Sequence, residues 1–304
     1  MRILKILLLG AGLYVLVQMV LSTGPKAVAA HLIPLGWKVL PLFLIYPFAY
    51  YFNTIGWMRS FPCPLPGRLP FWEIFRIRLI GENLNVVTPW AASVGGEPVK
   101  AHLLHERLGV PLGEGYASIL IVHISYFTSL NAFIIGAVAL TYRELSMPAL
   151  FWRCLLVFLI ALGAVTLGLL RALKAGLFDK SARVYFSDHA RRFLEGALFN
   201  FFAWCVGIAE IWWLAYALGV NLSFTEAWLV EALIQTVRIA TFFIPSSLGA
   251  QELGFVGILG IFSVGAPAAM AFAVLRRVRE IFWVAVGLAV WALLGKVPPV
   301  HDPA

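Results

Sequence analysis

Long apolar stretches constrain what this chain can fold into more than any other feature of its sequence. Five of them easily reach the about 20 apolar residues that a helix needs to cross the hydrocarbon core, and two more follow late in the chain. They occupy 3–21, 39–58, 116–142, 150–170, 197–219, 253–275 and 281–295, and "GAP" interrupts the sixth at 265–267. The chain is 61% hydrophobic and 12% charged, whereas soluble domains are about 45–50% apolar and about 25% charged. An all-α integral membrane protein is therefore predicted.

Composition also argues against several other classes of protein. Cys63, Cys154 and Cys205 are far apart and show no paired spacing, so neither a disulfide framework nor a metal site is predicted. The formal charge of +8 is better explained by basic cytoplasmic loops than by nucleic-acid binding. We find no nucleotide-binding loop, no zinc-protease motif and no serine-hydrolase motif, so no cofactor is predicted. Catalysis by embedded histidine or glutamate remains an alternative without a motif to support it.

Lysine and arginine predict the orientation of the chain. Basic residues concentrate at the N-terminus and in 59–115, 171–196 and 276–280. Because cytoplasmic loops carry an excess of these residues, all four regions are predicted to lie in the cytoplasm. This topology requires two semi-polar stretches, 71–100 and 227–250, to enter the membrane and return on the same side. The prediction is about seven to eight transmembrane helices and two broken, re-entrant segments.

Each semi-polar stretch contains a break with proline and glycine. The first is "TPWAASVGGEPVK" at 88–100 and the second is "IPSSLGAQE" at 244–252. Proline should end each preceding helix because it lacks an amide proton, and glycine allows tight turns that expose backbone amides. The similarity is typical of inverted repeats in transporters, here with halves 1–149 and 150–304, although two short matches also arise by chance. The residues concerned are Pro89, Gly95, Gly96 and Glu97, and then Pro245, Gly249 and Glu252.

The first break is a candidate site for an anion. A helix that starts near Glu97 presents unpaired N–H groups at its N-terminus, and Lys100 adds a positive charge. Asn83 and Asn85 precede the break and would bond freed carbonyls or a ligand. The alternative is a cytoplasmic turn in which these residues are only structural caps. The membrane-resident anion that suits such a site is a phospholipid or polyprenyl-phosphate head group.

Ionisable residues within or beside the later apolar stretches are further candidates, because charge is costly inside a membrane. Glu210 is either a binding or proton-relay group or a neutral acid with a partner. Glu252 is the strongest single candidate, since a basic cap on the last span explains the arginines after it but not this glutamate. Arg276 and Glu280 have the i, i+4 spacing of a pair, close to Arg279. Arg238 is predicted to pair with Glu231 or with Glu252.

Three motifs in this order resemble a known family. They are "GENLNVVTPWAASVGGEPVKAHLLHERLGVPL" at 81–112, "IPSSLGAQELGFVGILGIF" at 244–262 and "RRVREIFWVAVGLAVW" at 276–291. Together they are similar to the lysylphosphatidylglycerol synthase transmembrane-region family of flippase-like membrane proteins, and most similar to its branch in hopanoid biosynthesis loci. The resemblance covers essentially the whole chain. By position it places the family's motif residues on Asn85, Pro89, Gly95, Gly96, Glu97, Gly249, Glu252, Arg279 and Glu280.

The resemblance implies a helical bundle of the bacterial inner membrane that moves an amphiphilic lipid between leaflets. The lipid would be of the phospholipid, polyprenyl-phosphate or hopanoid type. In this hypothesis the two breaks meet near the midplane, where Glu97 and Lys100 read the head group and Glu252 with an arginine completes the polar path. The alternative is an enzyme, or the partner of a lipid-modifying enzyme, in hopanoid or glycolipid modification. A structural scaffold without transport is the third hypothesis.

Overall fold

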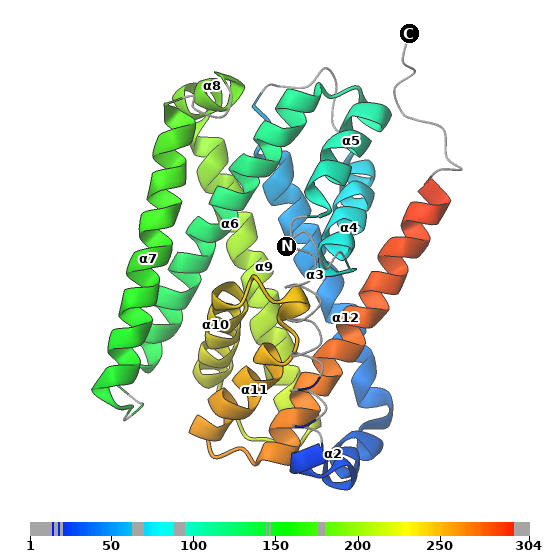
Figure 1. Cartoon of the computed structure of the whole chain (residues 1–304), viewed down its shortest axis with the longest axis vertical. Helices are drawn as coiled ribbons and strands as arrows, with labels where there is room; N and C mark the ends of the chain where they lie inside the picture. The colour runs from blue at the N-terminus through cyan, green and yellow to red at the C-terminus, as the bar shows by residue number, and fades with distance from the viewer. Residues whose placement is uncertain are drawn as a thin grey trace. The chain divides into compact units, whose positions relative to one another are not determined.

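A computed structural model describes residues 14, 18, 21–62, 70–87, 95–143, 145, 147–175 and 180–294. Within these residues all regular secondary structure is helical, as predicted (Figure 1). Most of the predicted first span, together with Cys63 and Pro89, lies outside the described residues. In the described part of the chain, four helical segments are long and apolar enough to cross a membrane: Pro25–Met58, Leu112–Thr141, Ala149–Lys174 and Ala190–Ala217. This architecture is that of a membrane protein.

Four of the predicted spans coincide with observed helices. These helices are α3 (Leu40–Met58), α6 (Leu112–Thr141), α7 (Ala149–Lys174) and α9 (Ala190–Ala217). The first candidate span also includes α2 (Pro25–Leu32) and the 3-10 helix η1 (Ile33–Val39). Gly36 in η1 has a φ of 48°, a conformation that glycine adopts at little cost, and the chain kinks there.

The exposed faces of α7 are apolar, as the outer surface of a membrane protein should be. Val157 and Ile160 are 65% and 62% exposed, and Leu150 and Leu156 are also exposed. A solvent-facing helix would place charged side chains at such positions. In a bilayer, however, lipid tails are as apolar as these side chains. The surface of α7 therefore fits lipid contact.

The prediction of one span at 253–275 is wrong. Two helices occupy this region, α11 (Ala250–Ile261) and α12 (Ala266–Leu294). Pro267 is the second residue of α12, where an N–H would lack a helical partner in any case, so proline is tolerated there. The predicted last span at 281–295 is wrong in its start, because α12 begins 15 residues earlier. As a consequence, the basic residues at 276–279 lie within a helix and not in a cytoplasmic loop.

Two pairs of helices flank the two breaks and match in length. The first pair is α4 (Phe71–Val87) and α5 (Glu97–Leu108), with 17 and 12 residues. The second pair is α10 (Phe224–Ala240) and α11, also with 17 and 12 residues. Nine residues separate the helices in each pair, 88–96 in the first and 241–249 in the second. The start of α5 at Glu97 agrees with the prediction.

The second break begins before its proline. The N-terminus of α10 has a capping box of Ser223 and Glu226, which fixes where the helix starts. The helix ends at Ala240, five residues ahead of Pro245. The expectation that Pro245 ends this helix is therefore wrong, and the proline instead begins the 3-10 turn η2 (Pro245–Ser247).

The described residues form two compact units. Unit 1 comprises those of Met1–Pro47, Ile80–Gly96 and Val206–Leu294, and unit 2 comprises those of Phe48–Leu79 and Glu97–Cys205. The boundaries fall within α3, α4 and α9 and at the start of α5. In unit 1, α11 packs on α10 and α12, and α2 packs on α12. In unit 2, α6 packs on α5, α7 and α8 (Lys180–Asp188).

Candidate functional site

Three arginines lie near the middle of α12, well away from both of its ends. Arg276 and Arg279 are buried, and their i, i+3 spacing places them on one face of the helix. Arg277 follows Arg276 and is 13% exposed in its side chain. Burying a cation is expensive unless carboxylates pair with it. The arginines of α12 therefore need acidic partners from neighbouring helices.

Arg276 and Arg279 bind two buried glutamates, and we call these four residues the inner cluster. Nη1 of Arg276 lies 2.5 Å from Oε2 of Glu231 on α10, and its Nε lies 3.3 Å from Oε1 of Glu210 on α9. Arg279 also pairs with Glu210. Gln235 donates a hydrogen bond of 2.6 Å from Nε2 to Glu231. The inner cluster thus ties α9, α10 and α12 together.

Neighbouring side chains fit closely around the inner cluster. A Cβ atom at Gly207 of α9 would lie 2.6 Å from Oε1 of Glu231, so the absence of a side chain there makes room for this carboxylate. The guanidinium carbon of Arg279 lies 3.8 Å from the ring centroid of Tyr46, within the range of a cation–π interaction. The inner cluster is thus packed as well as paired.

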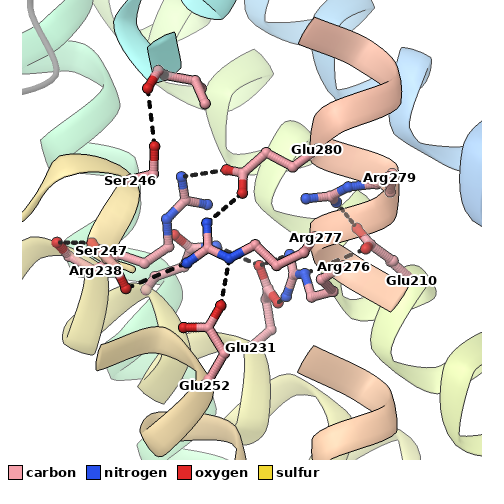
Figure 2. Close-up of polar contacts among 12 residues, drawn as sticks. Glu210, Glu231, Arg238, Ser246, Ser247, Glu252, Arg276, Arg277, Arg279 and Glu280 are labelled. Atoms are coloured by element: carbon pink, nitrogen blue, oxygen red, sulfur yellow. Dashed lines mark hydrogen bonds and ion pairs between the residues drawn. The ribbon is translucent and has the colours of Figure 1, made fainter. Parts of the chain in front are cut away.

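Arg277 organises a second group of charges, the outer cluster of Arg238, Glu252, Arg277 and Glu280 (Figure 2). Its Nε donates to Oε1 of Glu252 at 2.5 Å, and its Nη1 donates to Oε2 of Glu280 at 2.6 Å. Its Nη2 lies 3.4 Å from the carbonyl oxygen of Ser247 in the break. Nη2 of Arg238 lies 3.9 Å from Oε1 of Glu280. The outer cluster thus joins α10, the break, α11 and α12.

Glu252 connects the outer cluster to the start of α11. Its Oε2 accepts a hydrogen bond of 2.8 Å from the backbone N–H of Gly249, while its Oε1 accepts from Arg277. A carboxylate in the first turn of a helix also interacts favourably with the positive end of the helix dipole. One side chain therefore caps the broken helix and neutralises a partly buried arginine.

The break itself has an unusual backbone. Ser246 and Ser247 have φ values of 52° and 49°, and residues with a Cβ atom rarely adopt such values. The Ser246 hydroxyl donates a hydrogen bond of 3.0 Å to the carbonyl oxygen of Val86 near the end of α4 (Figure 2). Strained backbone of this kind persists only where surrounding contacts hold it, and it concentrates at functional sites.

The two clusters together contain equal numbers of opposite charges. Among the described residues they comprise four arginines, Arg238, Arg276, Arg277 and Arg279, and four glutamates, Glu210, Glu231, Glu252 and Glu280. Exposure is highest at Arg238, whose side chain is 34% exposed, whereas the side chains of Glu210 and Glu252 are each 1% exposed. Arg238 is therefore the most exposed member of this charge network.

The residues of the first break form different contacts. Oδ1 of Asn85 accepts a hydrogen bond of 2.7 Å from the backbone N–H of Gly96. Gly96 lies so close to the backbone of Gly81 that no Cβ atom would fit. Asn83 is buried against Gly287 of α12, and Gly95 lies in the turn before α5.

Glu97 and Lys100 lie in unit 2, where they pair with each other. Nζ of Lys100 is 2.8 Å from Oε1 of Glu97 and 5.9 Å from the ring centroid of Trp57. Nε2 of His123 lies 3.7 Å from the same Glu97 oxygen, and Nδ1 of His123 is 2.7 Å from the carbonyl oxygen of Ile119. The Lys100 ammonium is thus neutralised next to the start of α5.

Two of the predicted ion pairs are wrong. Arg276 pairs with Glu231 and Glu210, not with Glu280, because its partners come from other helices. Arg238 faces Glu280, not Glu231 or Glu252. Glu231 was predicted only as a partner of Arg238, and Arg277 only as one of the arginines that follow Glu252. Their ionisable character beside apolar sequence was a signal for both, whereas no sequence pattern indicated Tyr46.

Helices of membrane length, together with the buried charge network of unit 1, define an integral membrane protein. Residues 2–289 match the family described as Lysylphosphatidylglycerol synthase TM region. Because this match covers nearly the whole chain, the chain belongs to that family, as the motifs predicted, and is an integral membrane protein that acts on lipids. Comparisons with curated proteins and with solved structures give no match.

Proposed function

We propose that this protein binds an amphiphilic lipid and moves it between the leaflets of the bacterial inner membrane. The charge network of unit 1 is the observation that carries the proposal. A head group that crosses a bilayer needs polar partners along its way, because lipid tails offer none. Ionisable residues inside a membrane protein typically mark such pathways. The outer cluster offers these partners beside a broken helix, while the lipid tails would stay outside the protein.

The matching helix lengths support an internal repeat. An offset of 153 residues carries α4 onto α10 and α5 onto the range of α11. The same offset carries α6 to 265–294, and α12 occupies Ala266–Leu294. We propose that these elements are related by an inverted repeat with re-entrant breaks, as in many secondary transporters. The proposed topology places the N-terminus in the cytoplasm.

Glu252→Gln tests the proposed transport. The protein is reconstituted into liposomes that contain a phospholipid with a fluorescent head group, and reduction by external dithionite reports which leaflet the label occupies. We expect exchange with the wild-type protein and none above protein-free liposomes with Glu252→Gln, because the carboxylate that links Arg277 to the break is lost. Normal exchange with this variant would contradict the proposal.

The control must separate loss of function from loss of fold. A glutamine at 252 can still accept the hydrogen bond from Gly249, and Arg277 keeps its 2.6 Å contact with Glu280. We therefore expect Glu252→Gln to stay monodisperse in size-exclusion chromatography. Glu106→Gln is the matched control, because Glu106 is exposed and pairs only with exposed His102 among the described residues. It should exchange lipid like the wild type.

The family description favours a second candidate, a role in lipid modification. The matched family takes its name from a lipid synthase, so this chain would serve as an enzyme, or the partner of an enzyme, that modifies a hopanoid or glycolipid. Deletion of the gene would then cause the unmodified lipid precursor to accumulate. Translocation alone predicts an unchanged lipid composition with altered exposure of a lipid at the outer leaflet. Lipid analysis together with surface labelling separates the two candidates.

A further inference from the structure

Arg238 is the least engaged arginine of the charge network. Its guanidinium has five N–H donors, yet its contact with a described carboxylate is the 3.9 Å approach to Glu280, which is too long for a hydrogen bond. Arg276 and Arg277 each have a carboxylate oxygen at 2.5 Å. With a side chain that is 34% exposed, Arg238 is a cation at the exposed edge of the network whose guanidinium has hydrogen-bonding capacity that the described residues do not use.

Glu280 is the carboxylate that both arginines of the outer cluster share. One of its oxygens accepts from Arg277 at 2.6 Å, and the other faces Arg238 at 3.9 Å (Figure 2). Its side chain is 14% exposed, whereas those of Glu210 and Glu231 are 1% and 2% exposed. Arg277 keeps a second carboxylate, Glu252, at 2.5 Å. Glu280 can therefore leave Arg277 without stranding a buried cation.

The proposed repeat indicates that Arg238 is not needed to close its break. The offset of 153 residues pairs Asn85 with Arg238 and Gly96 with Gly249. In the first break Asn85 reaches forward and accepts a hydrogen bond from Gly96. In the second break Glu252 bonds to Gly249 instead. The position that Asn85 uses for capping thus carries an arginine whose side chain has no such structural task.

We propose that Arg238 and Arg277 bind the phosphate of a lipid head group and that Glu280 is an internal carboxylate which this phosphate displaces. The inference rests on the proposed function and assigns the head-group chemistry of its substrate. Guanidinium groups bind phosphate through paired N–H donors. An anion is favoured over a cation because the accessible group with unused donors is the guanidinium, whereas Glu280 already has a close partner.

The net charge of the network predicts whether each of two substitutions raises or lowers the affinity for phosphate. The network of four arginines and four glutamates is neutral. Glu280→Gln gives it one net positive charge and removes the competing carboxylate, so a larger fraction of the protein is ready to bind phosphate and the apparent affinity rises. Arg238→Gln gives it one net negative charge and removes donors, so the affinity falls.

Binding of a short-chain lipid to the full-length protein tests the inference. The probe is dihexanoyl-phosphatidylglycerol added to protein in a neutral detergent, with titration followed by isothermal calorimetry. We expect Glu280→Gln to bind about tenfold more tightly than wild type and Arg238→Gln about tenfold more weakly, each equivalent to about 1.4 kcal/mol. Arg191→Gln is the matched control, because its side chain is 91% exposed, and its affinity should not change.

Two further probes define what the site recognises. Dihexanoylglycerol lacks the phosphate. Neither substitution should change the affinity of the protein for it. Inorganic phosphate should bind more weakly than the lipid, and equal affinity would assign the site to free phosphate and overturn the lipid assignment. If Glu280 instead bound a cationic head group, Glu280→Gln would bind the lipid more weakly and Arg238→Gln would bind it more tightly. This result would overturn the proposal. Unchanged affinity in both variants would also overturn it and leave a structural ion pair.

A second variant and a second assay keep the test decisive. If Glu280→Gln does not give folded protein, Glu280→Asp retracts the carboxylate while it keeps the charge, and a smaller gain in affinity is expected. Leaflet exchange is measured in parallel. If the wild type exchanges lipid but the two variants do not change the lipid affinity in the expected directions, this inference alone is overturned. If the affinities change as expected but the wild type exchanges no lipid, the proposed transport is overturned and the phosphate site is retained.

Discussion

The two breaks have the same dimensions but are closed in different ways. In the first, the neutral amide of Asn85 comes from the helix before the break and accepts from Gly96. In the second, the carboxylate of Glu252 comes from the helix after the break, and its other oxygen binds Arg277. The first closure is a local cap, whereas the second is coupled to the buried charges. A change in the outer cluster must therefore reach the second break.

The largest expected effect concerns the inner cluster, which the second break reaches through α10 and α12 and which, among the described residues, the first break does not share. Arg276→Met leaves Glu231 with only Gln235 among its described hydrogen-bond partners, and removing one partner of a buried pair costs about 3–5 kcal/mol. We expect the variant to unfold at a much lower temperature or fail to accumulate. Thermal unfolding in detergent, followed by intrinsic fluorescence, measures the effect. Adding Glu231→Gln should restore part of the loss; equal stability of Arg276→Met and wild type would contradict the pairing.

The next effect compares the two glycines. At Gly96 a methyl group would meet the backbone of Gly81, and forced overpacking typically costs about 1–3 kcal/mol. At Gly249 the obstacle is a φ of 80°, and a left-handed conformation costs a residue with a Cβ atom about 1–2 kcal/mol. Both alanine variants should melt below wild type, and Gly96→Ala should melt lower. The reverse order would mean that the first break can move away from α4.

The smallest effect tests whether the first closure is only a cap. Asn85→Ala removes the acceptor for Gly96, and loss of a capping side chain typically costs about 0.5–2 kcal/mol. We expect a modest fall in the melting temperature with leaflet exchange retained. Glu252→Gln should behave in the opposite way, with exchange lost and the fold retained. If Asn85→Ala also abolished exchange, the two breaks would not differ in the way that their contacts indicate.

The local sequence predicted where the helices lie better than it predicted which side chains are in contact. The start of α5 at Glu97 was predicted, because the proline and glycine residues that precede it are a local signal. The start of α12 was missed because the charges at 276–280 resemble a loop when the rest of the fold is unknown. Those charges are tolerated only because Glu210, Glu231 and Glu252 arrive from three other helices.

The predicted pairs failed for a related reason. Spacing along one helix favours Arg276 with Glu280, but a glutamate on another helix can lie closer than one four residues away. The rotation of α9 and α10 about their axes decides which glutamate reaches Arg276, and apolar periodicity does not specify it. Single residues that fit around a charge, such as Gly207 beside Glu231, leave no local signal at all.

The equal numbers of arginine and glutamate in the network have an electrical consequence. A membrane potential acts on charge with about 2.3 kcal/mol per elementary charge for each 100 mV. If the eight side chains shift together across the membrane, the four positive and four negative charges cancel. The potential then does no net work on the network. In that case the network itself adds no voltage dependence to lipid movement.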